Sequence, residues 1–342
     1  MFPPLRTGRL VIRPFIESDV DSLHTRRNDP AVARWQNWTL PYSLERTEKM
    51  VSDVMAMEGP ATDDWWMATI ALAGTGEVIG DLAVNLTWGS RCSEIGYTLA
   101  PAHWGNGYAV EAGTAIVEYL FEEIGVTRVA GTLHPENIAS AMVLERLGFL
   151  FEGHTRLSYW VGDDNSDDWI YGLTRADWEA WRNRPRHTPV EVRLVEIDAD
   201  TMYPVWKLRT HKTQERLVAP VAASFAHAMF PEVVDGAPLV PWMRSIEADG
   251  EAVGFVMLAL ATDHHPHPYL WRLLIDRMHQ RRGIGALAMD LVEEQCRLWG
   301  NTELFTSWVP ERGSPGPFYR ARGYEPTGEI VDDEVEARKI LG

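Results

Sequence analysis

Trp104-Gly105-Asn106-Gly107-Tyr108-Ala109 is a glycine-rich turn that returns 176 residues later as Gln280-Arg281-Arg282-Gly283-Ile284-Gly285. Two further landmarks recur in the same order and at nearly the same shift: Glu77–Gly80 returns as Glu251–Gly254, and Leu147–Phe149 returns as Arg322–Tyr324. Three landmarks in one order predict a single fold that is written twice. The period is too long for a solenoid unit, so each copy is expected to be a domain with its own core.

The length of 342 residues fits two domains of ordinary size. We place the N-terminal domain at residues 1–183, a polar linker that contains prolines at 184–190, and the C-terminal domain at 191–342. The chain is 45% hydrophobic and 24% charged, as globular chains usually are. Cys92 and Cys296 lie in different copies and are expected to be idle thiols rather than a disulfide.

The formal net charge is −17, which repels nucleic acid and anionic membrane surfaces. This charge suits a cationic partner such as an amine, although solubility alone also accounts for it. Apolar runs fall short of the roughly 20 residues that cross a bilayer, and residues 1–10 lack the pattern of an export signal. We therefore expect a cytoplasmic protein that is a monomer or a homodimer.

Hydrophobic periodicity places the secondary structure in the same order in both copies. In the first copy it predicts strands at 10–15, 67–73, 78–86, 94–99 and 128–133, with helices from about 17, at 110–124 and at 140–147. In the second copy it predicts strands at 192–195, 252–260, 269–275 and 303–308, with helices at 213–229, 286–299 and 318–322. The order predicts a layered mixed α/β architecture, with a central sheet flanked by helices in each domain.

Each glycine loop lies between a predicted strand and a predicted helix. Backbone N–H groups at such a junction, together with the positive end of the helix dipole, can bind a pyrophosphate. A glycine loop alone is weak evidence, because a dinucleotide site, a P-loop and a tight turn all contain one. The loops lack Gly-Lys-Ser/Thr, and their glycines are too few for the G-x-G-x-x-G dinucleotide pattern.

The combined pattern resembles the acetyl-CoA site of the GCN5-related N-acetyltransferases (GNAT). The second copy has the Gln/Arg-x-x-Gly-x-Gly/Ala loop in full, and the first copy has Trp104 in the Gln/Arg position. The first copy is similar to the ribosomal-protein-alanine N-acetyltransferases in Glu94–Tyr97, Pro101–Ala109, Asn137, Ser140 and Leu147–Phe149. The second copy is similar to bacterial spermine/spermidine acetyltransferases in Gln214, Ser224–Ala226, Leu273–Asp276, Phe318–Tyr319 and Thr327–Glu329.

The resemblance implies two tandem GNAT domains that use acetyl-CoA as acetyl donor. In the first copy it implies these cofactor contacts: Tyr97, Leu99, Trp104, Gly105, Asn106, Gly107, Tyr108, Ala109, Asn137 and Ser140. In the second copy it implies Leu273, Ile275, Gln280, Arg281, Arg282, Gly283, Ile284, Gly285, Ala286 and Tyr319. A backbone N–H near Leu99 or Ile275 would polarise the thioester carbonyl. Asn137 and Ser140 are equally good helix caps.

Acetyl transfer to an amine needs a base for the ammonium and a proton donor for the departing thiolate. Glu94 is the candidate base of the first copy, where either Ser140 would have to act as the acid or the thiolate would leave unassisted. Tyr319 is the candidate acid of the second copy, where Leu270 occupies the strand position of Glu94. The second base is then expected among Glu329, Glu334 or a water. Each copy thus lacks one element that the other copy has.

The expected function is transfer of an acetyl group from acetyl-CoA to a primary amine, by direct attack in a ternary complex. The acceptor stays open among a polyamine, an aminoglycoside-like or amino-acid-like molecule and a protein N-terminus. The alternative is a non-catalytic CoA-binding or interaction protein in which one or both domains are degenerate. His264-His265-Pro266-His267 resembles a metal-binding tract, but prolines and the absence of nearby cysteines argue against it, and no metal site is predicted.

Overall fold

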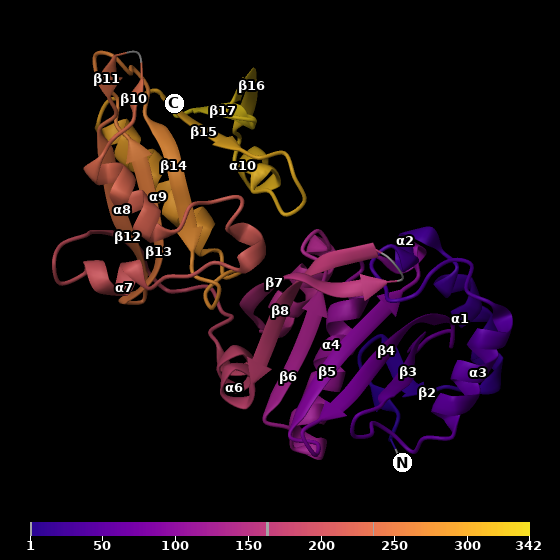
Figure 1. The fold of residues 1–342 in the computed structure, drawn as a ribbon. Helices are drawn as coiled ribbons and strands as arrows, with labels where there is room; N and C mark the ends of the chain where they lie inside the picture. Colours follow the sequence, from indigo (N-terminus) through magenta and orange to yellow (C-terminus); the bar gives the residue numbers. More distant parts are fainter. Residues whose placement is uncertain (1, 162–163, 235) are drawn as a thin grey trace. The chain divides into compact units, whose positions relative to one another are not determined.

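The computed structural model describes residues 2–161, 164–234 and 236–342. It divides into two compact units, Met1–Asn183 and Arg184–Gly342. Each unit has its own sheet flanked by helices (Figure 1). The mixed α/β architecture expected from the sequence is therefore confirmed. No helix within the described ranges is long and apolar enough to cross a membrane.

The first unit is built on a sheet with the order β1-β2-β3-β4-β5-β6-β8-β7. Its strands are β1 (Leu5–Arg6), β2 (Leu10–Pro14), β3 (Trp65–Leu72), β4 (Val78–Thr87), β5 (Cys92–Leu99), β6 (Arg128–Leu133), β7 (Leu150–Val161) and β8 (Asp164–Thr174). Its helices are α1 (Val20–Arg27), α2 (Pro30–Ala33), α3 (Leu44–Met55), α4 (Tyr108–Tyr119), α5 (Ile138–Leu147) and α6 (Arg175–Asn183). Among the described strands of this unit, only β5 and β6 pair in parallel.

The second unit repeats this plan with the order β16-β17-β15-β14-β13-β12-β9. Its main strands are β9 (Val192–Glu196), β12 (Pro241–Ala248), β13 (Glu251–Ala259), β14 (Tyr269–Ile275), β15 (Glu303–Trp308), β16 (Glu325–Val331) and β17 (Glu334–Ile340). Its helices are α7 (Met202–Trp206), α8 (Val221–Met229), α9 (Ile284–Leu298) and α10 (Gly316–Ala321). A small hairpin, β10 (Val233–Val234) with β11 (Ala237–Pro238), stands apart from this sheet.

Both sheets separate at their parallel strand pair. The β5–β6 ladder ends at Glu94 opposite Ala130, and the β14–β15 ladder ends at Leu270 opposite Thr306. Beyond these points β5 continues for residues 95–99 and β14 for residues 271–275 without a partner on that side. Backbone groups along these two edges are therefore available to a ligand, because they are not used by a neighbouring strand.

One predicted helix differs from the structure. The sequence pattern predicted a helix over 213–229, whereas the chain forms a short 3₁₀ turn at Lys212–Gln214 and α8 begins only at Val221. Pro220 precedes α8, and a proline disfavours helical backbone in the residue before it. The segment between the turn and α8 is consequently free to line the cavity described below.

Candidate active site

The two glycine loops have the same backbone conformation. Gly105 and Gly107 have φ values of 79°, and the corresponding residues Arg281 and Gly283 have φ values of 65° and 80°. Left-handed backbone is easy for glycine and costs other residues roughly 1–2 kcal/mol. Arg281 adopts it although it has a side chain, so the shape of the loop is retained where the sequence no longer favours it.

Each loop leads directly into a helix whose first turn lacks a side-chain cap. Gly107 is the N-cap of α4 and Gly283 is the N-cap of α9, and neither helix has a side-chain hydrogen bond to its first turn. The first N–H groups of an α-helix have no partner within the helix. Free N–H groups and a positive dipole end therefore face each loop, which is the arrangement that binds phosphate.

Trp104 and Gln280 make the same contact in their respective copies. The Trp104 Nε1–H donates to the Leu99 carbonyl oxygen at 2.8 Å, and the Gln280 Nε2–H donates to the Ile275 carbonyl oxygen at 3.0 Å. Leu99 and Ile275 are the last residues of β5 and β14. Tryptophan in the first copy thus replaces glutamine without loss of the bond that fixes the loop to the strand.

The N–H groups of Leu99 and Ile275 point away from the neighbouring antiparallel strand. The next residue in each chain, Ala100 or Asp276, donates its N–H to that strand, at Ile79 or Val253. Successive residues of a strand direct their polar groups to opposite sides. The N–H groups of Leu99 and Ile275 consequently lie on the unpaired side of β5 and β14, as the oxyanion prediction requires.

Arginine side chains near the loops are arranged differently in the two copies. Arg9 donates from Nη1 to the Asn106 carbonyl oxygen at 3.0 Å and is half exposed, although the sequence pattern gave no reason to select it. Arg282 was predicted to contact the cofactor, but its guanidinium is buried and donates to the His187 carbonyl oxygen at 2.9 Å. The Arg282 side chain therefore faces the domain interior, and only its backbone is presented in the loop.

Glu94 of the first copy lies in an acidic cluster on the sheet face opposite α5. Its carboxylate shares a hydrogen bond with Thr132, and burial raises its pKa above the ordinary value, with a further contribution from the nearby Asp168. Asp168 is buried and accepts a hydrogen bond from the Ser158 hydroxyl at 2.8 Å. A carboxyl with a raised pKa is a stronger base than an exposed one, and the cluster attracts a cation.

Ser140 and Tyr97 contact each other on the other face of the same sheet. The Tyr97 phenol lies 2.9 Å from the Ser140 hydroxyl and donates to the Ser140 carbonyl oxygen at 3.0 Å. Burial raises the pKa of Tyr97, so the phenol stays neutral and keeps its proton. Asn137 accepts from the Ser140 N–H at 3.2 Å and is therefore the cap of α5, one of the two roles considered from the sequence.

The second copy contains a cavity of about 160 Å³ at the point where β14 and β15 separate. Tyr319, Glu334 and Gln280 contribute to its lining. Tyr319 is buried, stacks on Trp308 and hydrogen-bonds Thr306, and burial raises its pKa. Glu334 accepts a hydrogen bond from the Ser307 hydroxyl. Glu329, the other carboxylate suggested by the sequence, is exposed on β16 and does not line the cavity.

A β-bulge in β14 explains why the side chain of Leu270 does not lie on the sheet face that Glu94 occupies in the first copy. Leu270 occupies the ladder position that Glu94 has in the first copy, because each is the last residue in parallel pairing. The β13–β14 register shifts between Met257 and Leu258, so Trp271 is an extra residue on β14. Leu270 consequently packs in the hydrophobic cluster on the α9 side. This strand position of the second copy therefore carries no carboxylate.

Family models match both copies. Residues 9–150 match an acetyltransferase (GNAT) domain, and residues 201–324 match the acetyltransferase (GNAT) family. The N-acetyltransferase p20 of Bacillus licheniformis, itself uncharacterized, is 32% identical over 155 residues, which cover 44% of this chain and 85% of the relative. The chain belongs to the GNAT acetyltransferase family. Both halves are GNAT domains, as the loop, strand and helix pattern predicted.

Two further relatives resemble part of this acetyltransferase. The uncharacterized N-acetyltransferase YoaA of Bacillus subtilis is 28% identical over 176 residues, covering 51% of this chain and 98% of the relative. The ribosomal protein uS5-alanine N-acetyltransferase of Escherichia coli is 30% identical over 88 residues, covering 26% of this chain and 45% of the relative.

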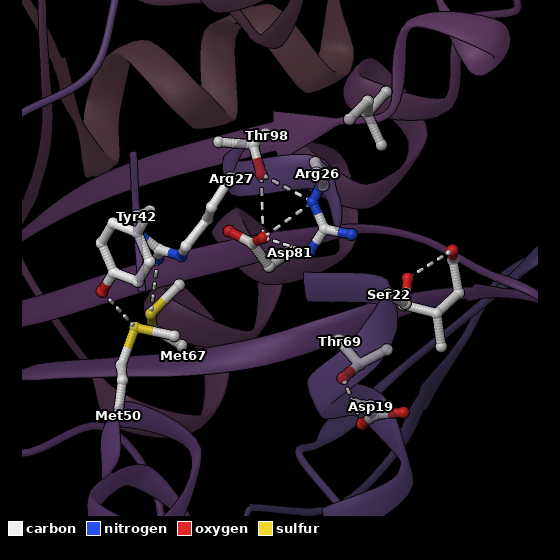
Figure 2. Close-up of polar contacts among 12 residues, drawn as sticks. Asp19, Ser22, Arg26, Arg27, Tyr42, Met50, Met67, Thr69, Asp81 and Thr98 are labelled. Atoms are coloured by element: carbon white, nitrogen blue, oxygen red, sulfur yellow. Dashed lines mark hydrogen bonds and ion pairs between the residues drawn. The ribbon is translucent and has the colours of Figure 1, made fainter. Parts of the chain in front are cut away.

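A buried ionic network fixes α1 of the acetyltransferase to its first sheet (Figure 2). Arg26 donates to Asp81 at 2.5 Å from Nη2 and 3.1 Å from Nε, and the Thr98 hydroxyl donates to the same carboxylate at 2.8 Å. Thr98 and Glu94 lie on one face of β5, because their positions differ by an even number of residues. The network therefore supports the strand that carries the candidate base.

No group of three or more His, Cys, Asp or Glu side chains within 2–161, 164–234 and 236–342 is arranged to hold a metal ion. In the histidine tract, His265 contacts the Ala237 carbonyl oxygen at 3.3 Å, and His267 lies 3.6 Å from Glu303. The tract thus forms local contacts between strands of the second unit.

Proposed function

We propose that each GNAT domain binds acetyl-CoA and transfers its acetyl group to a primary amine. The observation that carries this proposal is the repeated pair of features at each site: a strand with one unpaired edge, and an uncapped helix that begins at a left-handed glycine. The cofactor pyrophosphate would lie at the start of α4 and α9, and its pantetheine arm along β5 and β14. Acetyl-CoA is the usual cosubstrate of this family.

In the first copy, the amine nitrogen attacks the thioester carbonyl after Glu94 has taken its proton. The Leu99 N–H stabilises the oxyanion, the new C–N bond forms, and the C–S bond breaks. The departing thiolate accepts a hydrogen bond from the Ser140 hydroxyl, which lies 2.9 Å from the oxygen of the neutral Tyr97 phenol. This arrangement gives the first copy both a base and a hydrogen-bond donor for the thiolate.

In the second copy, Glu334 takes the role that Glu94 has in the first. Glu334 and Tyr319 line one cavity from different elements, β17 and α10. Tyr319 retains its proton because burial raises its pKa, so it can protonate the departing thiolate. The Ile275 N–H stabilises the oxyanion. In this proposal, Ser140 and Glu334 take the roles for which the sequence pattern offers no residue at the usual position.

The acceptor of the first copy is proposed to be a cationic amine, either of a small molecule or of a protein N-terminus. The acidic pair Glu94 and Asp168 favours a positively charged group. The Escherichia coli relative of the first domain acts, by its name, on an alanine of a ribosomal protein. This supports the N-terminal amine as one class of acceptor for that domain.

Acetyl-CoA-dependent thiol release over a panel of primary amines and peptides tests this function. We expect turnover by the wild-type chain, and loss of about 10²–10⁴-fold in rate when Glu94→Gln and Tyr319→Phe are combined. Retained binding of CoA by the double variant would show that the loss is chemical. Absence of thiol release with every amine, while CoA still binds, would instead identify a non-catalytic CoA-binding protein.

A further inference from the structure

The cavity of the second copy contains a guanidinium as well as a carboxylate. Arg272 extends from β14 into the lining that also includes Glu334, Ser307 and Gln214. Its Nη1 donates to the carbonyl oxygen of Trp271 at 2.7 Å, whereas its Nε is buried and has no hydrogen-bond partner. Within the described part of the chain, Arg272 forms no ion pair. A charged donor group thus faces the cavity with its Nε unpartnered and with no carboxylate in ion-pair contact among the described residues.

Partial burial makes this arrangement of the Arg272 side chain costly. Desolvation lowers the pKa of Arg272, and the carboxylates of Glu334 and Glu232 offset this in part by their charge. Glu334 is engaged by the Ser307 hydroxyl. A guanidinium has parallel donors that match a carboxylate in a bidentate pair. A ligand carboxylate would therefore satisfy the unpartnered Nε and neutralise the partly buried charge.

The first copy has no charged side chain at the strand position that corresponds to Arg272. Arg272 and Gly96 each lie three residues before the end of the unpaired strand, at Ile275 and Leu99 respectively. The bulge at Trp271 occurs in β14 and not in β5, where the pairing with β4 is continuous. The two acceptor sites consequently differ in charge, with acidic groups in the first and mixed charges in the second.

We propose that the second domain acetylates small amines that carry a carboxylate, such as amino acids, with Arg272 as the residue that binds this carboxylate. The proposal rests on the function proposed above. Glu334 and Arg272 would hold the two ends of a zwitterion, the amine facing the thioester. The cavity of about 160 Å³ is below the range of roughly 300–1,000 Å³ for drug-sized ligands, which favours a small acceptor.

Amino acids and their decarboxylation products provide matched acceptors for the test. Lysine with cadaverine, ornithine with putrescine, and phenylalanine with phenethylamine differ only by the carboxylate. We would measure kcat/KM for each pair in full-length chains that carry Gly107→Glu, so that the first copy does not bind cofactor. We expect the amino acid of at least one pair to be preferred, and Arg272→Met to reduce that preference about 10- to 100-fold, mainly through KM.

Arg244→Met is the matched control. Arg244 lies on β12, and its Nη1 also donates to the carbonyl oxygen of the preceding residue at 2.7 Å, but it does not line the cavity. This variant should keep the preference for the amino acid that the Gly107→Glu chain shows. Arg272→Lys retains the charge without the planar fork and should lose part of the preference. Arg272→Lys serves as the test variant if the Arg272→Met protein does not fold.

A binding measurement separates recognition from catalysis. With CoA present, lysine should raise the melting temperature of the parent more than cadaverine does, and Arg272→Met should remove the difference. Equal or better use of the decarboxylated amines, or an unchanged preference in the Arg272 variants, overturns the proposal and leaves acetyl transfer intact. Absence of thiol release from the wild-type chain with every primary amine and peptide of the panel described above would overturn the proposed function itself.

Discussion

Glu94 combines burial with a neighbouring carboxylate, and both effects determine how the residue responds to pH. Burial raises the pKa of Glu94 above its ordinary value of 4.5. The native state therefore holds this proton more tightly than the unfolded chain does. The stabilisation from this group is present below pH 4.5 and is lost as the pH rises through the raised pKa.

Glu94→Gln is accordingly expected to separate activity from stability. At pH 8 the variant should lose about 10²–10⁴-fold in the rate of the first copy, as removal of a general base does. Its melting temperature should equal or exceed that of the wild type at pH 8, because no buried charge is left, and the difference should vanish at pH 4. A melting temperature well below that of the wild type at pH 8 would contradict the assigned environment.

Individual residues were predictable where a local pattern identified them. Gly107, Gly283 and Trp104 stand inside the repeated loop, so the sequence alone pointed to them. Arg9 and Asp168 were not predicted as site residues because neither belongs to the repeated motifs. Arg9 reaches the first loop from the turn between β1 and β2, and Asp168 reaches Glu94 from β8, more than seventy residues away in the sequence. Only the paired strands bring them together.

At the scale of elements, α1 is attached to β4 and β5 by the ion pair of Arg26 with Asp81, whose side chains are 2% and 4% exposed. Asp81→Asn removes the charge and leaves a buried guanidinium without a counterion. We expect a loss of about 3–5 kcal/mol in the stability of the first domain. Calorimetry of the full chain should show a lower melting temperature for one transition only.

Asp53→Asn is the control for this prediction, because Asp53 pairs with Lys49 on the exposed face of α3 with side chains 62% and 74% exposed. Such surface pairs contribute about 0–1 kcal/mol. If both variants melted alike, the buried pair would not be what holds α1 against the sheet.

The elements that the sequence predicted best are those with regular periodicity. Strands 128–133, 269–275 and 303–308 were predicted with the bounds that the structure has. The bulge in β14 could not be predicted, because an inserted residue within a strand reads as an ordinary strand position. The bulge turns Leu270 towards the α9 cluster and brings Arg272 to the cavity. Charge at the second site therefore depends on pairing register, which a single sequence does not specify.

For the whole molecule, the repeated loops predict two cofactor sites per chain. Gly107→Glu and Gly283→Glu each place a carboxylate where the phosphates would bind, at φ values of 79° and 80°. A Cβ at either position meets no atom closer than 3.6 Å, so the fold should tolerate the change apart from backbone strain. Titration calorimetry with CoA should give two sites for the wild type, one for either variant and none for both together.

Gly76→Glu and Gly250→Glu are the controls that separate the effect of a carboxylate in the phosphate-binding loop from the backbone strain of a side chain at positive φ. Both glycines lie outside the loops, have φ values of 76° and 85°, and have no atom within 4 Å of an added Cβ. They impose the same left-handed strain away from the phosphates, so both variants should retain two CoA sites. A wild-type stoichiometry of one would mean that one copy has lost cofactor binding, and whichever glycine variant then abolished it would identify the copy that still functions.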